Sequence, residues 1–533
     1  MQLDTEFHID EEVHKRRWSV LAVLCLAVFV TVMDGTIVNV ALPSLVTDLG
    51  ATTRELQWIV DAYLLVFTGL LLAAGSFGDR YGRRRALLFG LTAFLGTSVL
   101  AGSMTSPGSL IVGRGLMGIG AALIFPATLA VLTNTFADPK ERAAAIGIWS
   151  AMSGVAVAAG PIVGGWLLEH FWWGSVFFVN VPLIAITLVG VAAVVPESSD
   201  ESTPPLDWRG LVLSIAAIGT VVFTIIEAPE WGWVSANTAA GAALGVALVA
   251  AFVWWELRVP HPMFPVRIFS NLRFSAASVS ITAAFFSLFG FVFLITQYFQ
   301  LVRDYTPLQA GVRTLPVAIA IAAASVAAPK VVESVGTKVV VAGGLGLMSA
   351  SFLWISTASA VTAYVEIVGQ MVVLGIGLGM TAAPATESIM GSLSADKAGV
   401  GSAVNDTTRE LGGTLGVAVI GSVFNSVYVG ALRAGELFPQ LPDIARGPTE
   451  DSVGAATIVA ERMPDGLVSA YLGEVSDAFL SGLAVACTVT AVVAAAGALF
   501  AARFLPARAE ASQAGAPDPA AGGAREPGVL PTT

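Results

Sequence analysis

Charged residues are scarce in this sequence, and their scarcity excludes a soluble globular protein. Asp, Glu, Lys and Arg make up only 12% of the 533 residues, whereas a typical soluble domain contains about 25%. Hydrophobic residues make up 55% of the chain, and the mean hydropathy is +0.78. Most of the chain is therefore expected to lie in lipid.

Cysteine, histidine and catalytic motifs are also lacking. Cys25 and Cys487 both lie in apolar runs, and the four histidines are scattered, so neither a disulfide framework nor a metal site is expected. The net charge of −11 comes without a basic face, which argues against nucleic acid as a partner. The sequence has no Gly-Lys-Ser/Thr phosphate loop and no Gly-x-Ser-x-Gly elbow, so we expect no enzymatic activity, no ATP coupling and no cofactor.

Long apolar runs dominate what is present. Each run is long enough to cross a hydrocarbon core of roughly 30 Å as a helix, which predicts an all-α integral membrane protein with fourteen transmembrane helices. The runs fall near 18–42, 57–77, 85–104, 109–134, 143–168, 173–195, 209–227, 237–255, 274–300, 308–329, 338–356, 362–391, 399–428 and 477–503.

The lysines and arginines indicate how the chain is oriented. Most of them fall in the segments that are cytoplasmic if the N-terminus is inside, as the positive-inside rule requires. We therefore expect a multi-pass cell-membrane protein with both termini in the cytoplasm. Residues 1–17 would form a retained cytoplasmic tail, 429–475 a long external loop, and 506–533 a disordered cytoplasmic tail.

One stretch interrupts the apolar pattern with a dense group of arginines. Residues 75–85 read GSFGDRYGRRR, which predicts a tight cytoplasmic turn between two membrane helices, because glycines permit the turn and arginines fix its side. Asp79 can accept hydrogen bonds from a helix N-terminus and from guanidinium groups. The residues of interest are Gly75, Gly78, Asp79, Arg80, Gly82, Arg83 and Arg84.

A diluted copy of this stretch indicates an internal duplication. In PKVVESVGTK (329–338), Glu333, Gly336 and Lys338 take the places of Asp79, Gly82 and Arg84. The repeat predicts a six-helix bundle over 18–195 and a second over 274–505, with two extra helices in a linker over 196–273. The alternative is that any cytoplasmic loop contains glycine and lysine.

The fifth apolar run carries a face with almost no side chains. Gly154, Gly160, Gly164 and Gly165 would let another helix pack backbone to backbone, and Pro161 would permit a bend. We expect a movable, closely packed hinge here. The alternative is an ordinary glycine-rich membrane helix.

These motifs together resemble the major facilitator superfamily. The 75–85 stretch is similar to its signature loop, and MDGTIVNVALPSL (33–45), QWIVDAYLL (57–65), GRGLMGIGAA (113–122) and SGVAVAAGPIVGG (153–165) look like elements of its fourteen-helix drug/proton antiporters of the quaternary-ammonium/multidrug exporter type. The resemblance implies a proton gradient as energy source. It also implies that Asp79 and the neighbouring arginines latch the two bundles together on the cytoplasmic side when the cavity opens outward.

Three ionisable residues of the N-terminal half lie inside membrane spans, where a charge costs about 2.5–3.5 kcal/mol even on the mildest scale. Counting residues from the span ends places Asp34, Asp61 and Arg114 at one depth. In the family that the chain resembles, their helices share a bundle, which makes an Asp34–Arg114 pair credible. Protons and a cationic drug would then compete for the same carboxylate. The alternatives are a static ion pair and an Asp61 at the headgroup level.

The second half has its own polar cluster, in SAVNDTTRELGGTLG (402–416). Asp406 and Glu410 share a helix face, and Arg409 can pair with Asp406. In the quaternary-ammonium exporters an aromatic residue usually stands at the position of Arg409, and this departure weakens the case for dicationic substrates. Glu387 faces either the cavity or the cytoplasm. Phe286, Phe289 and Tyr298 in the ninth run would give the cavity an aromatic wall, unless that helix faces lipid.

The resemblance implies a proton-driven antiporter that exports amphipathic, cationic compounds from the cytoplasm. Its partners would be lipid, small amphipathic substrates and protons, with no accessory protein indicated by the sequence. The alternatives are a dedicated exporter of one secondary metabolite, which confers self-resistance, and a membrane sensor that keeps the fold without transport.

Overall fold

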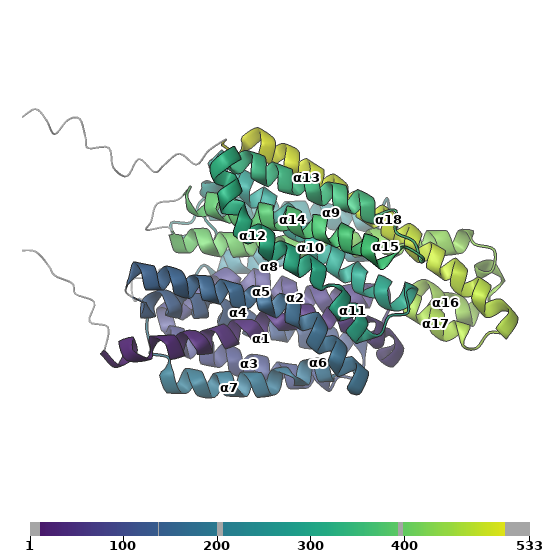
Figure 1. The fold of residues 1–533 in the computed structure, drawn as a ribbon, viewed down its shortest axis with the longest axis horizontal. Helices are drawn as coiled ribbons and strands as arrows, with labels where there is room; N and C mark the ends of the chain where they lie inside the picture. The colour runs from purple at the N-terminus through teal and green to yellow at the C-terminus, as the bar shows by residue number, and fades with distance from the viewer. Residues whose placement is uncertain (1–10, 137, 200–205, 393–397, 507–533) are drawn as a thin grey trace, which may run out of the picture.

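The structure is a computed structural model that describes residues 11–136, 138–199, 206–392 and 398–506. Within these residues every regular element is helical, and fourteen helices are long and apolar enough to cross a membrane. The predicted all-α membrane architecture is therefore confirmed. Figure 1 shows the helices packed along one common direction in two groups.

The first group is the N-terminal bundle. Its sixth span consists of two helices separated only by Val179, whose φ of −60° and ψ of −27° are themselves helical. The helices are α1 (Glu11–Leu49), α2 (Thr53–Tyr81), α3 (Arg83–Gly102), α4 (Pro107–Thr135), α5 (Pro139–His170), α6 (Ser175–Phe178) and α7 (Asn180–Val194).

The second group is the C-terminal bundle. Its first helix ends in a π-helical turn, η2 (Tyr298–Val302), and its second member is broken at Thr314, shortly before Pro316. The helices are α10 (Leu272–Gln297), α11 (Pro307–Arg313), α12 (Leu315–Val335), α13 (Thr337–Ile355), α14 (Tyr364–Met390), α15 (Ala398–Ala434) and α18 (Asp465–Phe504).

The two bundles repeat the same packing. α2 packs on α4, α1 on α5 and α3 on α4, and the corresponding pairs α12–α14, α10–α15 and α13–α14 pack likewise. Gly82 and Gly336 join the second and third helices of each bundle, and both have positive φ, +114° and +87°. A positive φ is accessible to glycine at little cost, so the two turns that the sequence aligns also share their backbone conformation.

Two inserted helices follow the N-terminal bundle. α8 (Trp208–Trp231) packs on both α2 and α15, whereas α9 (Ala236–Glu256) packs mainly on α8. A small separate core of Val222, Ile226 and Ala418 holds α8 against α15. The insert thus contacts both bundles. A short 3₁₀ helix, η1 (Val266–Ser270), leads from it into α10.

The molecule has two ends that differ in structure. One end, here named the terminal side, carries the start of α1, the α2–α3 turn and the end of α18. The opposite end, named the hairpin side, carries α16 (Asp443–Asp451) and α17 (Val453–Ala460), which project beyond the bundles in Figure 1.

One expectation about the extramembrane segments needs correction. The predicted external loop over 429–475 is largely helical, because α15 continues to Ala434, α18 begins at Asp465, and η4 (Phe438–Gln440), α16 and α17 lie between them. α1 begins at Glu11, so the predicted cytoplasmic tail over 1–17 includes the first turns of this helix, and its position relative to the membrane stays a prediction. The predicted disordered tail over 506–533 lies outside the described residues, apart from Pro506.

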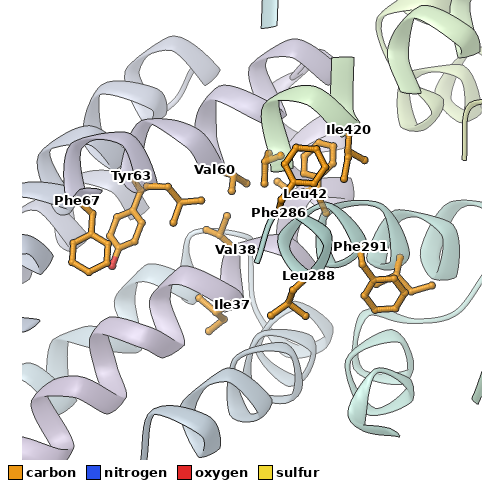
Figure 2. Close-up of a cluster of buried hydrophobic side chains, with 14 of the residues drawn as sticks. Ile37, Val38, Leu42, Val60, Tyr63, Phe67, Phe286, Leu288, Phe291 and Ile420 are labelled. Carbon is orange, nitrogen blue, oxygen red and sulfur yellow. The ribbon is translucent and has the colours of Figure 1, made fainter. Parts of the chain in front are cut away.

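The bundles meet through an apolar interface near the middle of the molecule. Side chains from four helices take part, and all belong to one continuous buried cluster. Those drawn in Figure 2 include Ile37, Val38 and Leu42 of α1, Val60 of α2, Phe286 and Leu288 of α10, and Ile420 of α15. Phe286 is 7% exposed, so this part of α10 faces protein and not lipid.

Candidate functional site

A buried ion pair lies at the centre of the N-terminal bundle. Arg114 of α4 donates from Nη1 to Asp34 Oδ2 of α1 at 2.6 Å, and both residues are 0% exposed. The structure therefore brings together the two residues that the sequence places at one depth. Removing either partner would leave an uncompensated charge in a low-dielectric interior.

Arg114 is held by more than the carboxylate. Its Nε donates to the backbone carbonyl of Ile59 at 3.1 Å, and its guanidinium lies 4.2 Å from the ring centre of Tyr63. The hydroxyl of Tyr63 donates to the carbonyl of Thr31 at 3.2 Å. The guanidinium of Arg114 thus contacts α2, at Ile59 and Tyr63, as well as α1, at Asp34. Its interactions therefore depend on the positions of both helices.

The second oxygen of Asp34 has a partner that the sequence analysis missed. Asn180, the first residue of α7, donates from Nδ2 to Asp34 Oδ1 at 2.8 Å and to Ser98 Oγ at 3.1 Å. Ser98 Oγ in turn donates to the carbonyl of Phe177 at 2.9 Å. The signal available in the sequence was an amide inside an otherwise apolar run.

Asp61 lies near this site but outside its hydrogen-bond network. It is 0% exposed, and neither carboxylate oxygen has a hydrogen-bond partner among the described residues. Asp61 is enclosed by protein, and its depth in the membrane, at the level of Asp34 or of the headgroups, stays a prediction. A buried carboxyl without a partner is stable only in its protonated form or with a ligand that the structure does not contain.

The polar cluster of α15 pairs internally, as its spacing predicts. Arg409 Nη1 lies 3.7 Å from Asp406 Oδ1, and Asn405 Nδ2 donates to the same oxygen at 3.4 Å. The guanidinium of Arg409 also lies 4.6 Å from the ring centre of Phe285. Glu410 lies one helix turn further and is half-buried. Arg409 therefore offsets the charge of Asp406.

The remaining predicted substrate residues are dispersed. Glu387 is exposed near the C-terminal end of α14. Phe289 packs its ring on Gly413 of α15. Tyr298 is 1% exposed and donates from its hydroxyl to the carbonyl of Ser359 at 2.7 Å. The assignment of Tyr298 to a cavity wall is wrong for this conformation, because its polar end is fixed to the α13–α14 connection.

The glycines of α5 make the close approaches that a bare face permits. A Cβ at Gly164 would lie 2.7 Å from Ile37 Cγ1 of α1, and one at Gly160 would collide with Thr36. A Cβ at Gly165 would lie 2.6 Å from Leu308 Cα of α11, which belongs to the other bundle. The carbonyl of Pro161, inside α5, faces Gly311 of α11.

Gly154 differs from the other glycines of this motif. It is exposed, and a Cβ added there would meet nothing within 4 Å. The close packing predicted for this position is absent in this conformation. The contact face of α5 therefore spans Gly160 to Gly165, with Gly154 beyond it.

The 75–85 stretch forms the tight turn that its glycines predict, but its contacts stay within the N-terminal bundle. Arg83 Nε donates to Asp79 Oδ1 at 2.7 Å. The carboxylate of Glu197, which follows α7, accepts from the backbone N–H of Arg84 at 3.1 Å and lies 3.5 Å from Arg85 Nε.

The other members of the stretch have ordinary helical surroundings. Cβ atoms added at Gly75 and Gly78 would lie 3.6 Å from Pro126 and 3.4 Å from Ala86, respectively. The guanidinium of Arg80 lies 5.9 Å from the ring centre of Tyr81. Arg84 Nη2 donates to the carbonyl of Ala192 at 2.6 Å. No hydrogen bond or ion pair joins this stretch to the C-terminal bundle among the described residues.

Hydrogen bonds between the bundles close the hairpin side. Gln57 of α2 donates from Nε2 to the carbonyl of Ala418 at 3.1 Å. Thr296 Oγ1 donates to the carbonyl of Asn39 at 3.0 Å, and Gln300 Nε2 donates to that of Val40 at 3.0 Å. Between described residues, all direct hydrogen bonds that link the two bundles lie in this half of the molecule.

Charged residues gather at the mouth of the hairpin side. Arg54 of α2 forms ion pairs with Glu227 and Glu230 of α8. Partial burial raises the pKa of Asp451 in α16, Glu55 and the other nearby carboxylates raise it further, and Arg54 opposes them. The mouth is thus acidic, with Arg54 joining the N-terminal bundle to the insert.

Comparison with known proteins places this geometry in context. The family model of the Major Facilitator Superfamily matches residues 24–417. The chain is 36% identical over 481 residues to the multidrug efflux pump LfrA of Mycolicibacterium smegmatis, covering 90% of this chain and 94% of that protein. It is 34% identical over 501 residues to the tetracenomycin C resistance and export protein of Streptomyces glaucescens, covering 91% of each.

Solved structures show the same fold at low sequence identity. A bacterial homologue of the human lysosomal transporter Spinster superposes with a TM-score of 0.65 at 16% identity, covering 92% of this chain and 97% of that one. At this identity the likeness concerns the arrangement of helices and not the transported compound.

Proposed function

Because this chain belongs to the major facilitator superfamily, we propose that it is a proton-driven antiporter that exports amphipathic, cationic drugs or toxic compounds across the cell membrane. It is a multi-pass membrane transporter and not an enzyme. Its relatives include a multidrug efflux pump and a methyl viologen resistance protein of Salmonella typhimurium, the latter 34% identical over 469 residues.

The observation that carries the proposal is the Asp34–Arg114 pair. An ion pair enclosed among α1, α2, α4 and α7 is expensive to bury, and a purely structural contact between apolar helices does not require it. Protonation of Asp34 would neutralise one partner and release Arg114 for new contacts. The chemistry of the pair therefore couples a proton to a change in the packing of α1 against α4.

Asp61 and the α15 cluster supply the second acidic region. Asp61 lies on α2 of the first bundle, and Glu410 lies on α15 of the second. A substrate cation that reached Asp61 would find the carboxylate free of any competing cationic side chain. Proton binding to Asp61 and cation binding to it would then exclude each other, which is the requirement for antiport.

The conformation supports alternating access. With the hairpin side closed by Gln57, Thr296 and the Gly165–Leu308 contact, substrate would enter from the terminal side. We place that side in the cytoplasm, because the arginines of the α2–α3 turn lie there. Opening of the hairpin side would separate α2 from α15 and α5 from α11. The turn that contains Asp79 could then hold the two bundles together on the terminal side.

A second candidate function is export of a single secondary metabolite. It is favoured by the 34% identity to a protein named for tetracenomycin C resistance and export, which is similar in degree to the identity with the multidrug pumps. The site geometry is common to both functions, since each requires proton coupling and an amphipathic substrate.

The experiment that tests the proposal uses inverted membrane vesicles containing the full chain. An imposed pH gradient should drive ethidium uptake into vesicles with the protein, and dissipating the gradient should stop it. Vesicles carrying Asp34→Asn, matched for expression, serve as the control. Competition by a panel of dyes and antibiotics then separates a multidrug pump, which many compounds inhibit, from a dedicated exporter. Uptake that does not depend on the gradient would overturn the proton-driven mechanism.

A further inference from the structure

We propose that Asn180 is a positioning residue for proton exchange at Asp34: its amide donates a hydrogen bond to the carboxylate when Asp34 is ionised and accepts one from the carboxyl O–H when Asp34 is protonated. The inference rests on the proposed role of Asp34 in proton coupling. It adds α7 to the three helices, α1, α2 and α4, that the Asp34–Arg114 pair already links.

Each oxygen of the Asp34 carboxylate accepts a hydrogen bond from a different residue. Arg114 donates to Oδ2 at 2.6 Å, and Asn180 donates to Oδ1 at 2.8 Å. Asn180 is 0% exposed, like the two charged residues. Hydrogen bonds to an ionised acceptor are roughly twice as strong as neutral ones, so Asn180 contributes directly to the stability of the charged state.

The second step concerns the other half of the same amide. Both hydrogens of Asn180 Nδ2 are engaged, one with Asp34 and one with Ser98 Oγ. Its Oδ1 is buried and has no hydrogen-bond partner among the described residues. A buried acceptor left without a donor is rare and costly in a native protein. The amide that donates to the Asp34 carboxylate therefore also carries an acceptor, Oδ1, without a hydrogen bond among the described residues.

The third step is what protonation requires. A protonated Asp34 carries an O–H that must find an acceptor, and Arg114 offers none, because a guanidinium only donates. A half-turn of the Asn180 amide about its Cβ–Cγ bond exchanges Nδ2 for Oδ1 in front of Asp34, and this torsion is soft for asparagine. The amide thus serves both protonation states, with the O–H of Asp34 donating to Oδ1 after the turn.

None of the charged or titratable groups on the described helices around Asp34 is placed to accept a hydrogen bond from protonated Asp34 in place of Asn180. Arg114 lies on α4, and Tyr63 and Asp61 lie on α2. α6, α7 and α17 contain no titratable residue, and the charged residues of α5, α10 and α11 lie in their end turns. The hydroxyl of Tyr63 is directed to the carbonyl of Thr31, and no hydrogen bond joins Asp61 to the network.

The test measures protonation of Asp34 directly, without transport. Full-length protein in lipid nanodiscs, free of substrate, is titrated while infrared absorbance follows the carbonyl stretch of protonated carboxyl groups. The band that disappears in Asp34→Asn belongs to Asp34. Asn180→Leu keeps the side-chain volume but removes both donor and acceptor. We expect its midpoint to move to higher pH by about one unit, a tenfold gain in proton affinity, because the charged form loses the stronger bond.

A graded series separates positioning from a general loss of structure. Asn180→Asp keeps the shape but places a second carboxyl beside Asp34, so its midpoint should move further in the same direction, and it is the second variant if the leucine variant does not fold. Thr187→Val is the matched control. Thr187 lies on the same helix, is 0% exposed and donates to the carbonyl of Leu183 at 2.7 Å, and its replacement should leave the midpoint unchanged.

The outcomes distinguish the two proposals. If wild-type Asp34 gives no titrating band, proton coupling at this residue fails, and the role of Asn180 fails with it. If Asp34 titrates in the wild type but Asn180→Leu and Asn180→Asp share the wild-type midpoint, only the role of Asn180 is overturned. A midpoint that moves equally in Thr187→Val would also overturn it, because the shift would then reflect loosened packing of α7.

Discussion

Arg114 Nη1 and Asp34 Oδ2 lie 2.6 Å apart with both side chains fully buried. The pair joins α4 to α1, and Arg114 also lies against Tyr63 of α2. A proton at Asp34 therefore changes the electrostatic link among three helices of one bundle.

Arg114→Ala should destabilise the folded protein strongly. It leaves Asp34 buried without its cation, and the loss of one partner of a buried pair costs about 3–5 kcal/mol. The control is Arg409→Ala, because the Arg409 side chain is 39% exposed and its Nη1 lies 3.7 Å from Asp406 Oδ1, a longer and more exposed ion pair. That change should cost less than about 1 kcal/mol. Thermal unfolding in one detergent measures both, and equal losses would contradict a special role for the Asp34–Arg114 pair.

Gly165→Leu should disfavour the conformation that is closed on the hairpin side. A Cβ added at Gly165 would lie 2.6 Å from Leu308 Cα, a backbone atom that cannot move aside as a flexible side chain could. Spin labels on Thr47 and Asp304, which are exposed on the hairpin side of the two bundles, should report a longer mean distance in the variant.

Gly154→Leu is the matched control, because a Cβ at that position meets nothing within 4 Å. Its distance distribution should equal that of the parent. If both leucine variants leave the distribution unchanged, the α5–α11 contact does not determine the closed state.

Asp79→Asn should slow transport while leaving the fold intact. In this conformation Asp79 accepts from Arg83 at 2.7 Å within the α2–α3 turn, a partly buried pair four residues apart, of a kind that contributes only a few tenths of a kcal/mol to stability. Its proposed role as a latch arises only when the hairpin side opens, so the loss should appear in the rate and not in the unfolding temperature. Unchanged export rates at equal expression would rule the latch out.

The α16–α17 hairpin should become less protected as pH rises. The pKa of Asp451 is raised by partial burial and by neighbouring carboxylates. A folded-state pKa above the unfolded value stabilises the protonated form, so this contribution is complete below the unfolded pKa of about 4 and is lost as pH rises through the folded value. Hydrogen exchange of α16, corrected for its intrinsic pH dependence, measures the change.

Asp451→Asn tests the origin of that dependence. The amide cannot ionise, so α16 should keep its protection at neutral pH and lose the dependence. Retention of the full pH dependence in the variant would assign it to another carboxylate of the acidic mouth, such as Glu55 or Glu450.

Much of this architecture is predictable because lipid imposes simple rules. Apolar runs of sufficient length identify the fourteen spans, and the repeated glycine of the cytoplasmic turns identifies the duplication, which reappears as the positive φ of Gly82 and Gly336. The Asp34–Arg114 pair was predictable from the common depth of the two residues together with the family resemblance, which places their helices in one bundle where opposite charges gain by meeting.

The remaining features depend on packing that a sequence does not display. The amide of Asn180 is part of the site because the start of α7 packs against α1 and α3. Tyr298 seemed suited to a cavity wall by its aromatic neighbours, yet its hydroxyl is directed to Ser359. The helical content of 435–464 was missed because polar, proline-containing segments resemble loops.

Joint measurement of drug flux and proton flux in reconstituted vesicles with an imposed pH gradient tests the coupling role of Asp34 most directly. Wild type should exchange drug for protons, Asp34→Asn should lose gradient-driven export because an amide cannot exchange a proton, and Asp34→Glu should keep part of the activity with a shifted pH profile. Asp61→Asn is measured in parallel. Gradient-driven export that survives in Asp34→Asn, or that is lost only in Asp61→Asn, would contradict the account and move the coupling role to α2.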